Sequence, residues 1–169
     1  MSDNTNPSLL QGADSSGKST ANTRFNTNQK SNLGRKLVQE LVDSGIPIDL
    51  QYLLNYKYVS KEVAFQLMGY RWSGWVVLYT DLDGNPYTYN GKPFYRIKPD
   101  TGQLTGYKPP KYLSAKGSGC RPYYSPLLKE QDLIDDLKKT GDVIITEGEK
   151  KTDSLVFHGF TAIGIAGVD

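Results

Sequence analysis

The stretch VIITEGEKKTDSLVFHGFTAIGIAGVD, residues 143–169, is the segment of this sequence that most clearly indicates a fold. Residues 143–145 form a short apolar run of the kind found in buried parallel strands. A helical segment follows over 150–158, Gly159 ends it, and 161–165 form a second short apolar run. This order of elements predicts a β-α-β unit, so the end of the chain begins an α/β domain.

An acidic residue, Glu147, follows the first apolar run and precedes Gly148. Open α/β sheets place their binding sites at the carboxyl ends of the strands, and glycine permits a tight turn there. In this position Glu147 would be free to bind a metal or to move a proton. The alternative is that Glu147 and Glu149 stabilise the positive end of the following helix. In that helix, Leu155 and Val156 are the residues expected to face inward.

Three short segments with helical periodicity stand near the beginning of the chain. They cover residues 35–44, 49–56 and 60–68, and Ser60 is the expected N-cap of the third. Each has apolar residues at helical spacing on one face. We therefore expect a small helical unit over 34–71.

Runs typical of β-strands occupy the middle of the chain. They lie at 75–79, 86–89 and 94–97, separated by the turn signals DLDG and NGKP. We expect a short antiparallel meander with basic aromatic loops over 72–125. The remaining segment, 126–169, opens with a helix that leads into the β-α-β unit, so the expected class is α+β.

The first segment, 1–33, is rich in Ser, Thr and Asn and poor in apolar side chains, which predicts a disordered polar tail. Within it, Gly12 is followed after four residues by Gly17, Lys18 and Ser19, the letter pattern of a phosphate-binding loop. That loop works only between a strand and a helix, and neither is indicated around it. A nucleotide hydrolase is therefore a remote alternative that requires this segment to be ordered against a strand.

Composition sets limits on the class of protein. The 169 residues carry a formal net charge of +2, so net charge alone indicates no polyanionic partner. The single cysteine, Cys120, excludes an intrachain disulfide framework and fits a reducing compartment. No apolar run approaches the ~20 residues that cross a membrane, and the N-terminus lacks the apolar region of a signal peptide. We therefore expect a cytoplasmic protein with no membrane partner.

Basic residues are concentrated between residues 92 and 121, where the only acid is Asp100, and aromatic residues are interleaved with them. Cations neutralise phosphates, and aromatic faces stack on unpaired bases at ~1–3 kcal/mol per base. Single-stranded DNA or RNA is therefore the expected ligand. The alternative is that the tyrosines are half-buried packing residues and the lysines only aid solubility. The candidate contacts in and around this stretch are Lys98, Lys108, Lys111, Tyr112, Lys116 and Arg121.

Five blocks of the sequence point to a family when they are taken together. They are LVDSGI (41–46), GYRWSGW (69–75), YRIKPD (95–100), KYLSAKGSGCRPYYSP (111–126) and ITEGEKKTDSLVFHGFTAIGIAGV (145–168). These blocks resemble an uncharacterised Toprim-like domain family of plasmid and phage replication proteins. Toprim domains are shared by bacterial-type primases, type IA and type II topoisomerases and related nucleases.

The resemblance implies roles for several residues. Glu147 matches the Toprim glutamate, to which a general acid/base role or a metal contact is assigned. The family's Mg²⁺ is held by a later Asp-x-Asp pair, and this sequence ends before one; Asp81 and Asp83 lie upstream in a turn and are not candidates, so the metal ligands are unknown. Lys150 and Lys151 also fit the family, either as phosphate contacts or as a solvated helix face.

The resemblance also implies a biological role. It suggests the N-terminal part of a primase-like DNA replication protein of a mobile element, interrupted inside its Toprim-like domain. Such a chain would contact single-stranded nucleic acid, would work with a helicase domain or another replication partner, and would not be catalytic alone. A full-length relative would be a primase-like nucleotidyltransferase. The alternative from another class is a non-catalytic nucleic-acid- or protein-binding module.

Overall fold

The computed structural model describes residues 32–100, 110–139 and 141–166. Residues 1–31 of the expected tail, the phosphate-loop pattern at 12–19 and Lys108 lie outside these residues. The last two residues of the expected tail, 32 and 33, are helical instead. Among the described residues, no helix combines the length and the apolar character that crossing a membrane requires.

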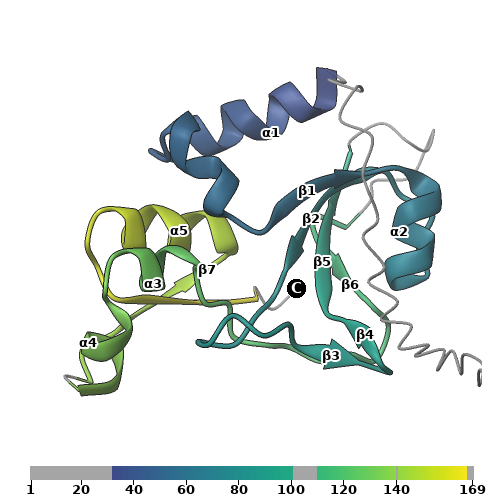
Figure 1. Ribbon diagram of the computed structural model, residues 1–169. Coiled ribbons are helices and arrows are strands. Elements are labelled where there is room, and N and C mark those ends of the chain that lie inside the picture. The colour runs from purple at the N-terminus through teal and green to yellow at the C-terminus, as the bar shows by residue number, and fades with distance from the viewer. Residues whose placement is uncertain (1–31, 101–109, 140, 167–169) are drawn as a thin grey trace, which may run out of the picture.

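The described chain is α+β, as the sequence predicts (Figure 1). A four-stranded antiparallel sheet stands at its centre, and a separate parallel pair of strands lies beside it. In chain order the elements are α1 (Asn32–Val42), the 3-10 helix η1 (Ile48–Leu53), β1 (Tyr56–Val59), α2 (Lys61–Met68), β2 (Gly74–Leu78), β3 (Thr88–Tyr89), β4 (Lys92–Pro93), β5 (Tyr95–Pro99), β6 (Leu113–Ser114), α3 (Leu127–Glu130), α4 (Ile134–Lys139), β7 (Ile144–Glu147), α5 (Glu149–Phe157) and β8 (Ala162–Ile165).

The central sheet has the strand order β1-β2-β5-β6. Successive side chains along a strand point to opposite faces, so the two faces carry different residues. One face carries Val76 and Ile97, which pack in the core with Ala64 and Met68 of α2. Figure 1 shows α2 on one side of this sheet and α5 on the other. The register therefore turns the alternate residues of β5, which include Arg96, toward α1 and α5.

The helical segments near the beginning of the chain are only partly as predicted. The first and third helices are confirmed as α1 and α2, and the Ser60 side chain caps α2 by accepting a hydrogen bond from the Val63 backbone N–H. The prediction of a helix over 49–56 is wrong, because η1 is a short 3-10 helix and Tyr56 opens β1. Strand β1 pairs along its length with β2, and this long-range pairing outweighs the helical spacing of the leucines.

The β-α-β unit predicted at the end of the chain is confirmed in its order of elements. Its first strand, β7, is not the buried strand that the apolar run indicates, because Ile144 and Ile145 are 40 % and 63 % exposed. Strands β7 and β8 pair in parallel, and α5 connects them. Tyr123 attaches this unit to the preceding loop through an antiparallel bridge with Gly164. A Cβ at Gly164 would lie 2.5 Å from Thr152 Oγ1 and 3.1 Å from Tyr123 Cβ, so the close approach requires glycine.

One main hydrophobic core joins the segments that the sequence divides into helical, antiparallel and α/β parts. It includes residues of α1, the central sheet, α3, α5 and β8. This shared core fixes α5 and α1 against the same face of the sheet, which places the side chains described below. Its buried members are Leu37, Leu41, Ile46, Leu54, Trp75, Val77, Tyr79, Phe94, Tyr123, Leu127, Leu128, Val156 and Ala162.

Candidate anion-binding site

A pocket of about 320 Å³ lies where the central sheet meets the β-α-β unit. Its lining contains one arginine, four lysines and two glutamates, so it is rich in cations. The side chains come from the end of α1, from β5, from the segment before β6 and from the β7–α5 junction. The lining residues are Ser44, Arg96, Lys98, Lys111, Tyr112, Glu147, Gly148, Glu149, Lys150 and Lys151.

The structure brings together most of the residues that the sequence predicts as a site. Glu147, Lys98, Lys111, Tyr112, Lys150 and Lys151 all line the pocket. Two other predicted residues lie elsewhere. Lys116 lines a different pocket beside α2, and Arg121 stands over the ring of Phe94, 5.7 Å from its centroid.

The position of Glu147 follows from the local chain. Strand β7 ends at Glu147, and Gly148 turns the chain into α5 with φ 91° and ψ 148°, a conformation open almost only to glycine. The tight turn expected at Gly148 is therefore present. The Glu147 side chain is exposed, and among the described residues it forms no ion pair. Its carboxylate is thus available at the pocket.

Glu149 is a buried partner of the central sheet, with only 1 % of its surface exposed. Its Oε1 atom accepts hydrogen bonds from the Tyr79 hydroxyl (2.6 Å) and from Arg96 Nη1 (3.2 Å). The other oxygen, Oε2, is buried without a hydrogen-bond partner. Glu149 therefore does more than interact with the dipole of α5, because its buried ion pair with Arg96 connects α5 to β5.

Arg96 forms the fixed cationic wall of the pocket. Its guanidinium stacks on the Tyr112 ring at 4.6 Å from the centroid and is itself mostly buried. Burial alone would lower the pKa of Arg96, but the charge of Glu149 and the contact with Tyr79 outweigh burial, and the pKa is raised. Arg96 therefore stays charged at every accessible pH.

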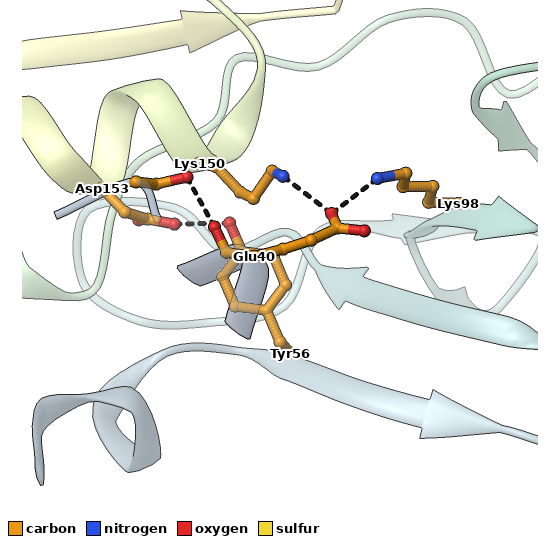
Figure 2. Close-up of polar contacts among 6 residues, drawn as sticks. Glu40, Tyr56, Lys98, Lys150 and Asp153 are labelled. Atoms are coloured by element: carbon orange, nitrogen blue, oxygen red, sulfur yellow. Dashed lines mark hydrogen bonds and ion pairs between the residues drawn. The ribbon is translucent and has the colours of Figure 1, made fainter. Parts of the chain in front are cut away.

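Two pocket lysines share an acidic partner from α1. Glu40 Oε2 lies 2.6 Å from Lys98 Nζ and 2.8 Å from Lys150 Nζ, as Figure 2 shows. Burial alone would raise the pKa of Glu40, but the hydrogen bonds from Lys150 and Lys98 prevail and lower it. Both ammonium groups also lie over the ring of Trp75, at 5.5 and 5.9 Å from its centroid.

A second buried carboxylate, Asp153, holds α5 against the sheet and is not part of the pocket lining. It accepts hydrogen bonds from the Tyr56 hydroxyl (2.5 Å) and the Tyr123 hydroxyl (2.9 Å); Figure 2 shows the contact with Tyr56. Burial raises the pKa of Asp153 to about 7, although the hydrogen bonds from Tyr56, Ser125 and Tyr123 act in the opposite direction. No pattern in the sequence singles out this residue.

The raised pKa of Asp153 predicts a pH-dependent stability. The folded protein holds this proton more tightly than the unfolded chain, so the contribution is complete below about pH 4 and is lost as pH rises toward 7. The expected slope is about −1.4 kcal/mol per pH unit in that window. In Asp153→Asn the side chain is uncharged at every pH, and this slope should disappear. Urea denaturation of both proteins from pH 4 to pH 8 measures it, and parallel stability curves would contradict the assignment.

The aromatic residues interleaved with the cations mostly serve packing. Phe94 and Tyr123 are core residues, with 3 % and 1 % of their surface exposed, so they cannot stack on bases. Tyr112 is half-buried and packs edge-on against Trp75, 6.0 Å between ring centroids. Tyr107 lies outside the described residues. Among the described aromatic residues of this stretch, Tyr112 lines the pocket.

No family model, curated protein or solved structure matches this chain. The resemblance to Toprim-like replication proteins therefore stays an expectation from the sequence.

The described residues of the pocket offer few ligands for a metal ion. Among them, no three His, Cys, Asp or Glu side chains gather in a group that could hold a metal ion. Of the two pocket carboxylates, Glu149 is paired with Arg96, which leaves Glu147. One carboxylate can hold Mg²⁺ together with water or ligand oxygens, so the described residues leave the remaining metal ligands unknown. Asp81 instead accepts hydrogen bonds from the Asp83 and Asn85 backbones, as expected for a turn.

Proposed function

We propose that this chain binds single-stranded nucleic acid and that the cation-rich pocket holds its phosphates. The observation that carries the proposal is the convergence of Arg96, Lys98, Lys111, Lys150 and Lys151 on one pocket. Clustered Lys and Arg side chains neutralise phosphates and release their counterions, which supplies most of the affinity in nucleic-acid binding.

The cations of the pocket differ in how freely they can meet a ligand. Lys111 and Lys151 are exposed, and neither forms an ion pair with another described residue. They can therefore move to a phosphate without breaking an existing ion pair. The first turn of α5 also borders the pocket, and its positive dipole end favours an anion there.

The size of the pocket favours a single strand over a duplex. Its 320 Å³ is at the lower end of the ~300–1,000 Å³ typical of small-ligand pockets. This space suits a short stretch of one sugar-phosphate backbone, whereas a duplex would contact only the rim. The half-buried Tyr112 offers an aromatic edge at the same wall.

We propose in addition that the chain is the nucleic-acid-contacting part of a primase-like replication protein of a mobile element, working in the cytoplasm with a helicase or another replication partner. What supports this wider proposal is the sequence resemblance, together with an available carboxylate, Glu147, at the carboxyl end of β7. In a full-length relative Glu147 would serve as the general acid/base, and Mg²⁺ would need ligands beyond those described. By itself this chain would bind without catalysing a reaction.

The test is a fluorescence-anisotropy titration of labelled single-stranded DNA at two salt concentrations, with and without Mg²⁺. We expect binding that weakens with salt, with a logarithmic slope of about −0.7 for each phosphate neutralised. A duplex of the same sequence should bind more weakly, and Mg²⁺ should not be required. RNA of the same sequence, titrated in parallel, separates the two single-stranded ligands. Absence of binding at about 50 mM salt, where such binding is strong, would refute the proposal.

A further inference from the structure

One oxygen of Glu40 occupies a position between two pocket cations. Lys98 Nζ approaches Glu40 Oε2 from β5 at 2.6 Å, and Lys150 Nζ approaches it from α5 at 2.8 Å. Figure 2 shows the two ammonium groups on either side of this oxygen. Two donors from different elements around one anionic oxygen form the arrangement that also binds an oxygen of a phosphate.

Both lysines have a contact besides Glu40. Each belongs to an element held in the fold by its own contacts, and each ammonium lies over the ring of Trp75, which is itself buried. The pair of cations would therefore remain together if the carboxylate moved away. They would then form a ready site for another anion.

Glu40 can also leave without unfolding its helix. Helix α1 is anchored by Leu37 and Leu41, which are 8 % and 2 % exposed and belong to the main core. The Glu40 side chain itself is 20 % exposed, so its carboxylate lies at the edge of the packed region. If the Glu40 side chain rotated toward solvent, it would therefore lose its two ion pairs and few other contacts.

We propose that Lys98 and Lys150 form a second phosphate subsite and that Glu40 occupies it as an internal competitor until a ligand phosphate displaces it. The inference rests on the proposed nucleic-acid binding and deepens it. One phosphate would bind Lys111 and Lys151, and the next would take the place of the Glu40 carboxylate. The ligand class is therefore an oligonucleotide with successive phosphates rather than a nucleotide with one phosphate.

The test is the substitution Glu40→Gln, measured with a labelled single-stranded deoxythymidine decamer by anisotropy. Removing the competing charge should raise the affinity about tenfold at about 100 mM salt. The salt slope should change little, because in the wild type a phosphate also occupies this subsite once Glu40 has been displaced. Thymidine monophosphate, used as a competitor, should be affected less than about twofold, because it fills only one subsite.

The matched control is Asp43→Asn, which makes the same charge change on the exposed turn that follows the same helix. Asp43 is exposed and accepts a hydrogen bond from Gln39 rather than from a cation, so the affinity of this variant should change less than about twofold. Tighter decamer binding in Glu40→Gln than in Asp43→Asn supports the subsite. If Glu40→Gln and Asp43→Asn bind the decamer with equal affinity, the subsite is contradicted but the proposed function is not. No decamer binding by wild type or by either variant at low salt would instead refute the proposed function.

A second variant tests the competitor role of Glu40 while keeping its charge. Glu40→Asp keeps the charge but shortens the side chain, so its carboxylate cannot bridge both lysines. It should bind the decamer more tightly than wild type, by a smaller factor than Glu40→Gln. If it binds no more tightly than wild type, the competitor role of Glu40 is contradicted.

Discussion

Replacing Arg96 with methionine is expected to destabilise the protein by about 3–5 kcal/mol, because it leaves the carboxylate of Glu149 buried without its cation. The remaining donor to Glu149 is the Tyr79 hydroxyl, and one carboxylate oxygen already has no hydrogen-bond partner. Methionine is unbranched and uncharged and can fill the space of the aliphatic part of Arg96, so most of the loss should come from the unpaired charge. Urea denaturation followed by tryptophan fluorescence measures the change in the free energy of unfolding.

A second substitution separates the charge effect from packing. Combining Arg96→Met with Glu149→Gln removes the unpaired charge while keeping an acceptor for Tyr79, so it should recover much of the stability. The control is Arg71→Met, since Arg71 is exposed and stacks on Phe65, and its removal should cost under about 1 kcal/mol. An Arg96→Met effect as small as that of Arg71→Met would show that the ion pair does not hold α5 to the sheet.

The elements that the sequence predicts well are those with local signals. The serine cap and the glycine after Met68 define α2, and the apolar runs around α5 define the β-α-β unit. Strand β1 has no comparable local signal. It is four residues long, and only its pairing with β2 selects an extended conformation over continuation of the helix. Interactions between distant segments decide such short strands, so a local pattern cannot reveal them.

The buried face of α5 shows why part of the site could not be predicted. The sequence predicts Leu155 and Val156 as the inward residues, and Val156 is indeed buried while Leu155 is only partly so. The remaining inward positions are Glu149, Thr152 and Asp153, at helical spacing from Val156. Polar residues at these positions resemble a solvated face until their partners are known. Here the partners of the two carboxylates are tyrosine hydroxyls and an arginine from distant segments.

Many of the pocket residues could be predicted from the sequence, although Arg96 was missed, but their grouping in space could not. Basic residue types and the carboxylate after a parallel strand can be recognised in the sequence. Their convergence cannot, because Lys98, Lys111 and Lys150 come from three separate segments. Lys111 and Lys116 illustrate the limit. They are equivalent members of one basic stretch in the sequence, but they flank β6 and line different pockets.

Substituting Lys111 and Lys151 together by alanine is expected to weaken single-stranded DNA binding on the order of tenfold to a hundredfold at about 100 mM salt. These are the two exposed pocket cations without an intrachain ion pair among the described residues, so removing them affects the ligand and leaves the fold intact. The logarithmic salt slope should become shallower by about 0.7 for each phosphate that is no longer neutralised. Anisotropy titrations at several salt concentrations give both quantities, and thermal unfolding verifies that stability is unchanged.

The matched control is Lys116→Ala with Arg121→Ala, which removes two cations from the same basic stretch outside the pocket. If the pocket is the binding site, this control keeps most of the affinity and most of the salt slope. If both double variants bind equally weakly, the strand follows the whole basic stretch, and the pocket has no special part in binding. Lys111 is near Lys116 in the chain but shares its pocket with Lys151. Binding at the pocket therefore predicts a larger loss of affinity for the Lys111/Lys151 variant, whereas binding along the basic stretch predicts similar losses for both double variants.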